Sequence, residues 1–214
     1  GYLEAVARYT DLGIEVRNYC KEHPACAVVN LGCGLDCTAE NNAGEGCKIY
    51  NIDRPDVIAV RNELIPPAEN VTNIGADLND TAWFDAIDDS RGVVFFAAGV
   101  FYYFLSSDIQ KLFTAMAERF KGGRLCFDAA NKKAVKLMLK TWVKAAGITD
   151  IDRYFYINNL DTDLKAWLPG TEISAKGYML GYHDLKTPSV SGLFRFLAKV
   201  GDGYMQMRIV RINF

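Results

Sequence analysis

The sequence predicts an α/β domain with a doubly wound, mostly parallel sheet of seven strands, and two observations support this prediction. Short apolar runs of strand length alternate with stretches of helical apolar spacing, which is typical of parallel βαβ units. The rhythm changes after about residue 150, where two strand-like runs flank one helical stretch. We expect these runs to pair at one edge of the sheet, with the last strand antiparallel.

Each expected element follows from local composition. The strands are expected at 25–31, 49–53, 71–76, 93–98, 125–128, 173–180 and 207–214. Helices are expected over the first 23 residues and at 55–64, 80–87, 106–120, 134–146 and 193–200. The first helix is expected to break at Gly13, Pro55 takes a favoured first-turn position, and Ser106 or Ser107 should cap its helix. No repeat or linker interrupts this order, so residues 1–214 are expected to form one domain.

Composition limits the classes of partner. Half of the 214 residues are apolar and 23% are charged, which is ordinary for a chain with one hydrophobic core. The formal net charge of -2 leaves no basic surplus, so we expect no nucleic-acid partner. Charged residues interrupt every apolar stretch well before the roughly 18 residues of a membrane span, so we expect no membrane partner either.

The cysteines show no paired CxxC spacing, and a chain of this size needs no disulfide framework. They are predicted to be reduced thiols in a cytoplasmic protein, with no metal site. Cys33 and Cys37 have the first half of a radical iron–sulfur spacing, but Glu40 occupies the position of the third ligand. Such a cluster is therefore not expected.

A glycine loop predicts a nucleotide site. Gly32-Cys33-Gly34 follows a buried strand directly, where a turn without side chains lets a ligand touch the backbone. Asp53 ends the next strand 21 residues beyond Gly32, the spacing at which an acidic side chain binds ribose hydroxyls. A dinucleotide site would need a third glycine where this chain has Cys37. Adenosine without phosphates therefore fits better.

Two further strand ends carry candidate binding residues. Asp77 closes the third expected strand and is placed to accept a hydrogen bond from an adenine amino group, with Leu78 under the ring. The alternative is a turn at Asp77 or a helix cap at Asp80. Tyr102 and Tyr103 follow the fourth strand, where open sheets form acceptor pockets, and the alternative for both is plain core.

Four stretches occur in order along the chain: 29–36 (VNLGCGLD), 50–58 (YNIDRPDVI), 75–78 (GADL) and 99–103 (GVFYY). Together they resemble the leucine carboxyl methyltransferase family, which includes polyketide O-methyltransferases similar to the tetracenomycin enzyme. The resemblance runs from about Ala5 to Asp128 and thins beyond. It implies a Rossmann-like class I methyltransferase that binds S-adenosylmethionine and releases S-adenosylhomocysteine.

The resemblance also implies roles for individual residues. Arg8 would pair with the carboxylate of the cofactor's methionine part and Gly32 would pass beneath it; the alternative for Arg8 is a solvated helix charge. Asp53 would hold the ribose. The cofactor-binding residues expected in all are Arg8, Gly32, Cys33, Gly34, Asp53, Arg54, Asp77, Leu78, Ala98 and Gly99, with Tyr102 and Tyr103 in the acceptor site. The acceptor would be a carboxylate or hydroxyl of a small molecule, such as a polyketide-like compound, or a protein C-terminal carboxylate.

Ala98 departs from the family pattern. The family usually has glutamate before Gly-Val, whereas this chain has Ala98. A carboxylate that could meet the amino or sulfonium end of the cofactor is therefore missing. This departure supports an alternative, a protein that binds S-adenosylmethionine or its product without catalysis.

The reaction itself requires little dedicated chemistry. Methyl transfer is an in-line displacement from a sulfonium, so the protein mainly aligns acceptor and methyl group in a dry pocket. A carboxylate acceptor needs no base, whereas a hydroxyl acceptor needs one. The histidines are His23 and His183, and His183 beside Tyr182 and Asp184 is typical of a surface loop. No catalytic residue is assigned.

A rival interpretation is an NAD-dependent short-chain oxidoreductase, because Tyr182 and Lys186 have the Tyr-x-x-x-Lys spacing of such enzymes. Gly181 and Pro188 bracket this pair too tightly for the helix that would align it, and the third glycine of a dinucleotide loop is absent. We therefore do not favour this interpretation.

The start of the chain leads to a further expectation. The chain begins with Gly1, a few residues before Arg8, whereas members of the resembled family carry N-terminal helices that fold over the cofactor. We expect a domain without this lid, with an open site and little turnover. Apolar surface around 101–104 would then be exposed or buried in a homodimer.

Overall fold

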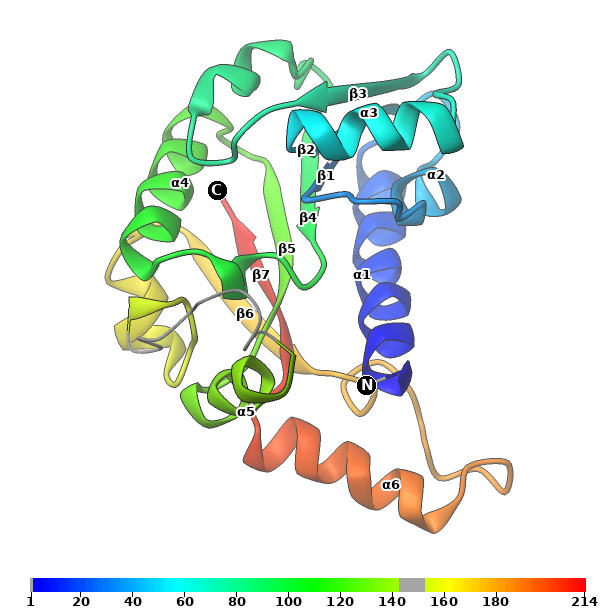
Figure 1. Cartoon of the computed structure of the whole chain (residues 1–214), viewed down its shortest axis with the longest axis vertical. Coiled ribbons are helices and arrows are strands. Elements are labelled where there is room, and N and C mark those ends of the chain that lie inside the picture. The colour runs from blue at the N-terminus through cyan, green and yellow to red at the C-terminus, as the bar shows by residue number, and fades with distance from the viewer. Residues whose placement is uncertain (1, 143–152) are drawn as a thin grey trace.

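A seven-stranded sheet crosses the middle of the molecule, and helices cover both of its faces (Figure 1). This computed structural model describes residues 2–142 and 153–214. The strand order is β3-β2-β1-β4-β5-β7-β6, so the direction of winding reverses between β1 and β4. In open sheets of this kind, ligands bind outside the carboxyl ends of the strands at that reversal. The strands are β1 (Ala27–Leu31), β2 (Lys48–Asp53), β3 (Val71–Gly75), β4 (Val93–Ala97), β5 (Arg124–Ala129), β6 (Glu172–Gly177) and β7 (Arg208–Asn213).

Among the strands of the described residues, β7 runs opposite to the other six. β1 to β5 pair in parallel, whereas β7 pairs antiparallel with both β5 and β6. The predicted α/β class, the mostly parallel sheet and the antiparallel last strand are confirmed. β7 lies one position inside the edge, which β6 forms.

Apart from α2, the α-helices lie near the positions predicted for them. The helices are α1 (Tyr2–Glu22), α2 (Thr38–Asn42), α3 (Pro55–Leu64), α4 (Ser106–Arg119), α5 (Lys132–Trp142) and α6 (Gly192–Lys199). Short turns lie at Thr81–Ala86, Phe101–Tyr103, Asp161–Lys165 and Val200–Tyr204. None of the helices within 2–142 and 153–214 has the length and apolar composition that a membrane crossing requires.

The central strands are apolar on both faces because helices cover both. All five residues of β1 and of β4 are buried. On one face, Phe95 and Phe127 pack in a core with residues of α4, and on the other, Val28 and Phe96 pack with residues of α1. Figure 1 shows α1 and α4 on opposite sides of the sheet. Continuous apolar runs were therefore a correct signal for buried parallel strands.

The predicted break at Gly13 is wrong. α1 continues through this residue from Tyr2 to Glu22. A β-carbon at Gly13 would lie 2.8 Å from Oδ1 of Asn42, so glycine allows α2 to pack closely on α1. The glycine serves a close approach between helices, and its cost in helix propensity, about 1 kcal/mol, is offset by packing.

Other local predictions differ from the structure at helix ends. The predicted serine cap of α4 is wrong, because Leu105 occupies the cap position and the Ser106 hydroxyl donates to the Tyr154 carbonyl instead. Thr38–Asn42, for which no helix was predicted, forms the short helix α2. The predicted end of the 134–146 helix lies outside the described residues.

Candidate functional site

The loop after β1 takes a shape that glycine permits. Gly32 and Gly34 have φ angles of 67° and 50°, in the left-handed region that favours glycine. A β-carbon at Gly32 would lie 2.5 Å from Cγ2 of Val100, whereas one at Gly34 would meet nothing within 4 Å. Gly32 therefore lets β1 and the segment after β4 come together, and the space at Gly34 is open to a ligand. Cys33 is buried and burial raises the pKa of its thiol to about 12, so this side chain stays neutral.

A buried arginine donates hydrogen bonds to the backbone carbonyls of this loop. Arg61 of α3 is fully buried and donates to the carbonyls of Gly34 at 3.0 Å and Asp36 at 2.8 Å. Its other terminal nitrogen donates to Oε1 of Glu40 at 2.7 Å, and the Asn51 amide donates to the same oxygen. The glycine loop is thus preorganised by hydrogen bonds to a charged group, which are stronger than neutral ones.

Asp53 lies beside the glycine loop at the end of β2. Its Oδ2 accepts from the backbone N–H of Gly34 at 2.7 Å, and its Oδ1 accepts from the N–H of Arg54 at 2.8 Å. A carboxylate has about four acceptor sites, so each oxygen can accept one more hydrogen bond. Asp53 is therefore fixed by the backbone and still able to bind two hydroxyls.

The neighbouring candidates occupy the outer part of this edge. Arg54 is exposed and pairs with Asp56 at 2.8 Å. Leu78 is buried, and Asp77 is exposed and accepts from the N–H of Asn79 at 2.9 Å, so the predicted turn at Asp77 forms. One oxygen of Asp77 is left for a ligand. A hollow of about 230 Å³ lies nearby and is lined by Asn79, Thr81, Asp108, Lys111, Leu112 and Ala115, none of which is a predicted site residue.

On the other side of the glycine loop, Arg8 meets a buried aspartate. Nη1 of Arg8 donates to Oδ2 of Asp128 at 3.1 Å, and the N–H of Gly99 donates to Oδ1 at 2.6 Å. The Asp128 side chain is 1% exposed and that of Arg8 is 23% exposed. Nε of Arg8 is buried and has no partner, so the guanidinium retains donor capacity for an anionic group. The alternative of a fully solvated helix charge for Arg8 is wrong.

Two tyrosines surround this ion pair. Burial raises the pKa of Tyr102 and of Tyr178 well above the usual range, and the charge of Asp128 acts in the same direction. Burial alone would lower the pKa of Arg8, but the charge of Asp128 more than offsets this effect and raises it. Both hydroxyls therefore stay protonated, and Arg8 stays charged.

The remaining candidates separate into buried and exposed positions. Ala98 and Gly99 follow β4 directly and are partly buried. Tyr103 is 53% exposed, whereas Tyr102 is buried. The predicted apolar surface at 101–104 is mostly wrong, because Phe101 is 1% exposed and packs against Phe113, Phe127 and other rings.

Tyr182, from the rejected oxidoreductase pattern, and the neighbouring His183 lie elsewhere. Tyr182 donates to Oε1 of Glu15 at 2.7 Å, and Nε2 of His183 lies 2.7 Å from Oδ1 of Asp11. Both contacts join the C-terminal part of the chain to α1. Neither side chain belongs to the edge that holds Gly32 and Asp53.

Sequence reasoning missed Asp128, Tyr178 and Arg61. Asp128 had a usable signal, because it ends a buried strand at the same edge as Asp53. Tyr178 and Arg61 had none, because their partners lie far along the chain and are brought to them by the fold.

Solved structures with the same architecture show which fold this is. The chain is similar to the plantazolicin methyltransferase BamL, with a TM-score of 0.63 and 11% identity over 96% of this chain and 84% of that one. A methyltransferase from Mesorhizobium loti has a TM-score of 0.61 and 16% identity over 94% and 96% of the two chains. A DUF574 family protein from Streptomyces avermitilis has a TM-score of 0.65 and 15% identity over 97% and 82%. The fold is that of class I methyltransferases.

Sequence comparison identifies the family within that class. The family model for leucine carboxyl methyltransferase matches residues 8–117, and the chain belongs to this family. It is also 29% identical over 108 residues to the tetracenomycin polyketide synthesis O-methyltransferase TcmP of Streptomyces glaucescens. That match covers 50% of this chain and 40% of TcmP, so the chain spans less than half of the relative's length.

Proposed function

We propose that this chain binds S-adenosylmethionine at the carboxyl edge of its sheet and transfers the methyl group to an oxygen atom of an acceptor. One observation carries the proposal: Asp53 and the Arg8–Asp128 pair flank the glycine loop where the strand order reverses. Family membership supports the same assignment. The bound cofactor would supply an electrophilic methyl group on a sulfonium.

The residues present fit the two ends of such a cofactor. Asp53 has acceptor capacity for two ribose hydroxyls, and the open space at Gly34 allows close approach of a ligand. Asp77 and Leu78 would hold the adenine. Arg8, whose Nε is unpaired, would hold the carboxylate of the methionine part.

Asp128 offsets the departure at Ala98. The family's usual glutamate is absent there, yet a buried carboxylate from β5 contacts the N–H of Gly99 beside it. We infer that Asp128 positions Arg8 and the backbone at Gly99. This role supports a binding site that remains ordered despite Ala98.

The acceptor that fits best is a carboxylate, of a small molecule or of a protein C-terminus. The buried hydroxyls of Tyr102 and Tyr178 have raised pKa values, so they donate hydrogen bonds and are poor bases. His23 stacks on Tyr19, and His183 bonds to Asp11. A carboxylate acceptor needs no base, whereas a phenol would need to ionise by itself.

The test has a binding arm and a turnover arm. S-adenosylmethionine and S-adenosylhomocysteine should raise the Tm of the chain by ligand linkage, and NAD and ATP should not. Equal stabilisation by NAD would overturn the proposed cofactor. Methyl transfer from labelled cofactor is then measured on matched carboxylate and phenol panels, with the faster rate expected for carboxylates.

Ala98 favours a second candidate, a protein that binds the cofactor without turning it over. Binding without transfer to any acceptor of either panel would support this candidate. Restoring the family's residue with Ala98→Glu should then create or increase transfer, while leaving the Tm response to S-adenosylhomocysteine in place.

A further inference from the structure

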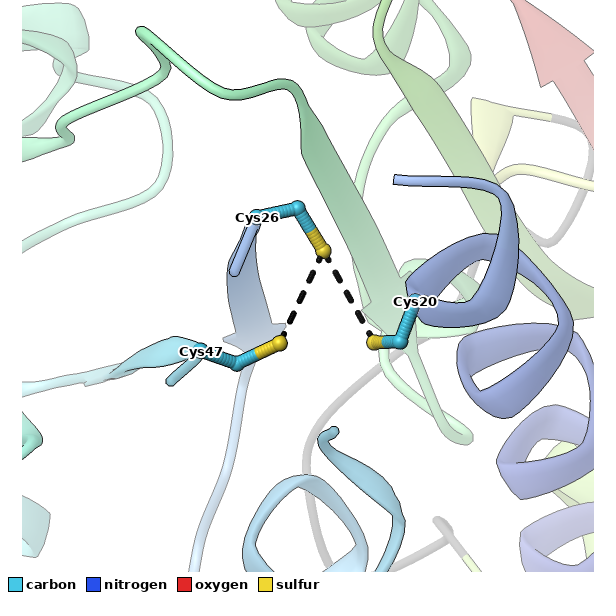
Figure 2. Close-up of side chains that lie close together, drawn as sticks. All are labelled: Cys20, Cys26 and Cys47. Carbon is cyan, nitrogen blue, oxygen red and sulfur yellow. Dashed lines mark hydrogen bonds between the residues drawn. The ribbon is translucent and has the colours of Figure 1, made fainter. Parts of the chain in front are cut away.

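Three cysteines meet at the amino edge of the sheet, opposite the proposed cofactor site. Cys20 lies near the end of α1, Cys26 immediately precedes β1 and Cys47 immediately precedes β2. Figure 2 shows the three side chains pointing toward one another. The Sγ of Cys26 lies 3.7 Å from that of Cys20 and 3.9 Å from that of Cys47, and all three sulfurs lie within 4.8 Å of one another.

These distances suit one shared metal ion. Zinc–thiolate bonds are about 2.3 Å long, so sulfurs that bind one ion in trigonal or tetrahedral geometry lie about 3.8–4.0 Å apart. The three side chains are 6%, 0% and 1% exposed in the order Cys20, Cys26, Cys47. Soft thiolate ligands select zinc and monovalent copper over hard cations.

The surrounding backbone supports the cluster. A β-carbon at Gly44 would lie 3.7 Å from the Cys47 sulfur, so the backbone at Gly44 packs against the cluster. Ala25, next to Cys26, has a φ of 60°, which is unfavourable for alanine.

We propose that Cys20, Cys26 and Cys47 bind one thiophilic d¹⁰ ion, Zn²⁺ or Cu⁺, that fastens α1 to the starts of β1 and β2. Each bound sulfur releases its proton to solvent, and no electron is transferred. Within residues 2–142 and 153–214, no histidine, carboxylate or further cysteine joins the cluster. Three-coordinate Cu⁺, or Zn²⁺ with an exogenous fourth ligand, would satisfy this set.

The spacing of these cysteines along the chain gave no hint of such a site. The ligands come from three separate segments and lack the paired spacing of common zinc motifs. The fold brings them together, because parallel β1 and β2 start side by side and α1 ends beside them. The inference is independent of the proposed methyltransferase function.

The experiment measures metal content and thiol protection in the full chain. After chelation under reducing conditions, Zn²⁺ or Cu⁺ is added, excess is removed and the metal is measured per chain. We expect one ion per chain for the wild type and for Cys126→Ala, which removes a buried thiol outside the cluster. Cys20→Ala, Cys26→Ala and Cys47→Ala should each lose stoichiometric binding.

A second measurement needs no variant. Bound metal should protect Cys20, Cys26 and Cys47 of the wild type from alkylation, mapped by mass spectrometry, while leaving the reactivity of Cys37 unchanged. Cobalt should give thiolate-to-metal charge-transfer absorption that the cluster variants lack. Absence of stoichiometric metal from the wild type, or protection unrelated to these cysteines, would overturn the proposal. Cofactor binding is measured separately and has no bearing on this outcome.

Discussion

The carboxylate of Asp53 is held in place by backbone N–H groups and still has acceptor sites for a ligand. Each of its oxygens already accepts one N–H, from Gly34 or from Arg54. These bonds fix the carboxylate at the edge of the loop, so binding a ribose would require little further ordering. A surface aspartate without such partners would have to be ordered by the ligand itself.

Replacing this carboxylate should weaken the cofactor site. We expect Asp53→Ala to reduce affinity for S-adenosylmethionine by about 1–3 kcal/mol, because hydrogen bonds to a charged acceptor are lost. Calorimetry measures the change, and Asp56→Ala, an exposed neighbour paired with Arg54, is the matched control. Equal affinity of Asp53→Ala and the wild type would remove Asp53 from the site.

Replacing Asp128 should weaken binding of the methionine part of the cofactor more than binding of its adenosine part. Asp128→Asn can still accept from Gly99, but its amide would face the donors of Arg8, which loses its charged partner. We expect affinity for S-adenosylmethionine to fall about tenfold, in line with a charged hydrogen bond. Binding of 5′-methylthioadenosine, which lacks the methionine carboxylate, should change far less.

The matched control for this variant is Glu15→Gln. Glu15 is another buried carboxylate on the same helix as Arg8, paired with Arg211 at 2.7 Å and remote from the glycine loop. It should lower stability without selectively weakening S-adenosylmethionine. Equal losses for both ligands in Asp128→Asn would show that Asp128 does not act through Arg8.

Residues adjacent to strand ends could be predicted from the sequence, and residues placed by tertiary packing could not. Gly32 and Asp53 were found because a strand, a glycine turn and a spaced carboxylate are local signals. Arg61 has no local signal on α3, and its role follows from the hydrogen bonds that it donates to the carbonyls of Gly34 and Asp36. Whether Gly32 and Asp53 bind the cofactor stays a prediction.

At the scale of elements, the N-terminal helix α1 is bonded to the C-terminal part of the chain through its acidic side chains. Oδ2 of Asp11 accepts from the N–H of Met179 at 3.0 Å, and its Oδ1 lies against His183. Glu15 binds Arg211 on β7. Sequence periodicity predicted this helix, but its continuity through Gly13 depended on the contact with α2. Local patterns give the type of an element more readily than its packing.

α3 supports the glycine loop through Arg61, and this link should matter for stability. Arg61→Leu would remove the donor to the Gly34 and Asp36 carbonyls and leave the Glu40 carboxylate with the Asn51 amide as its donor. We expect a loss of about 3–5 kcal/mol in the free energy of unfolding, as for one broken partner of a buried ion pair. Urea denaturation followed by circular dichroism measures this loss.

A surface pair provides the comparison. Arg119→Leu breaks the partly exposed contact with Asp89, for which a change below about 1 kcal/mol is expected. If Arg61→Leu destabilises the chain no more than Arg119→Leu does, the loop does not depend on α3.

At the scale of the whole molecule, the sheet separates two sites of different chemistry. The carboxyl edge gathers carboxylates and Arg8, whereas the amino edge gathers thiols. α1 is 21 residues long and reaches both, with Arg8 near its start and Cys20 near its end. The order of elements predicted the sheet, but which side chains meet at its edges depends on crossovers that no local pattern describes.

The free energy of unfolding of the whole chain should depend on Asp202. Burial raises the pKa of this carboxyl from 3.8 to about 7, and Asp11 adds to the effect, while a bond from the Leu180 N–H opposes it. One of its oxygens is buried without a partner. The folded chain therefore holds a proton that the unfolded chain releases, so this group's contribution is full below about pH 4 and is lost as pH rises through about 7.

Asp202→Asn should remove that loss, because the amide keeps the shape without a charge. We expect the variant and the wild type to have similar Tm values near pH 4, and the variant to be more stable above pH 7. Thermal unfolding at a series of pH values measures this. Asp88→Asn provides a control of opposite sign: a hydrogen bond from Lys48 lowers the pKa of Asp88, so losing the carboxylate should reduce stability at neutral pH. If the Tm of Asp202→Asn and the Tm of the wild type change with pH in parallel across this range, the pKa of Asp202 is not raised in the folded chain and the prediction is wrong.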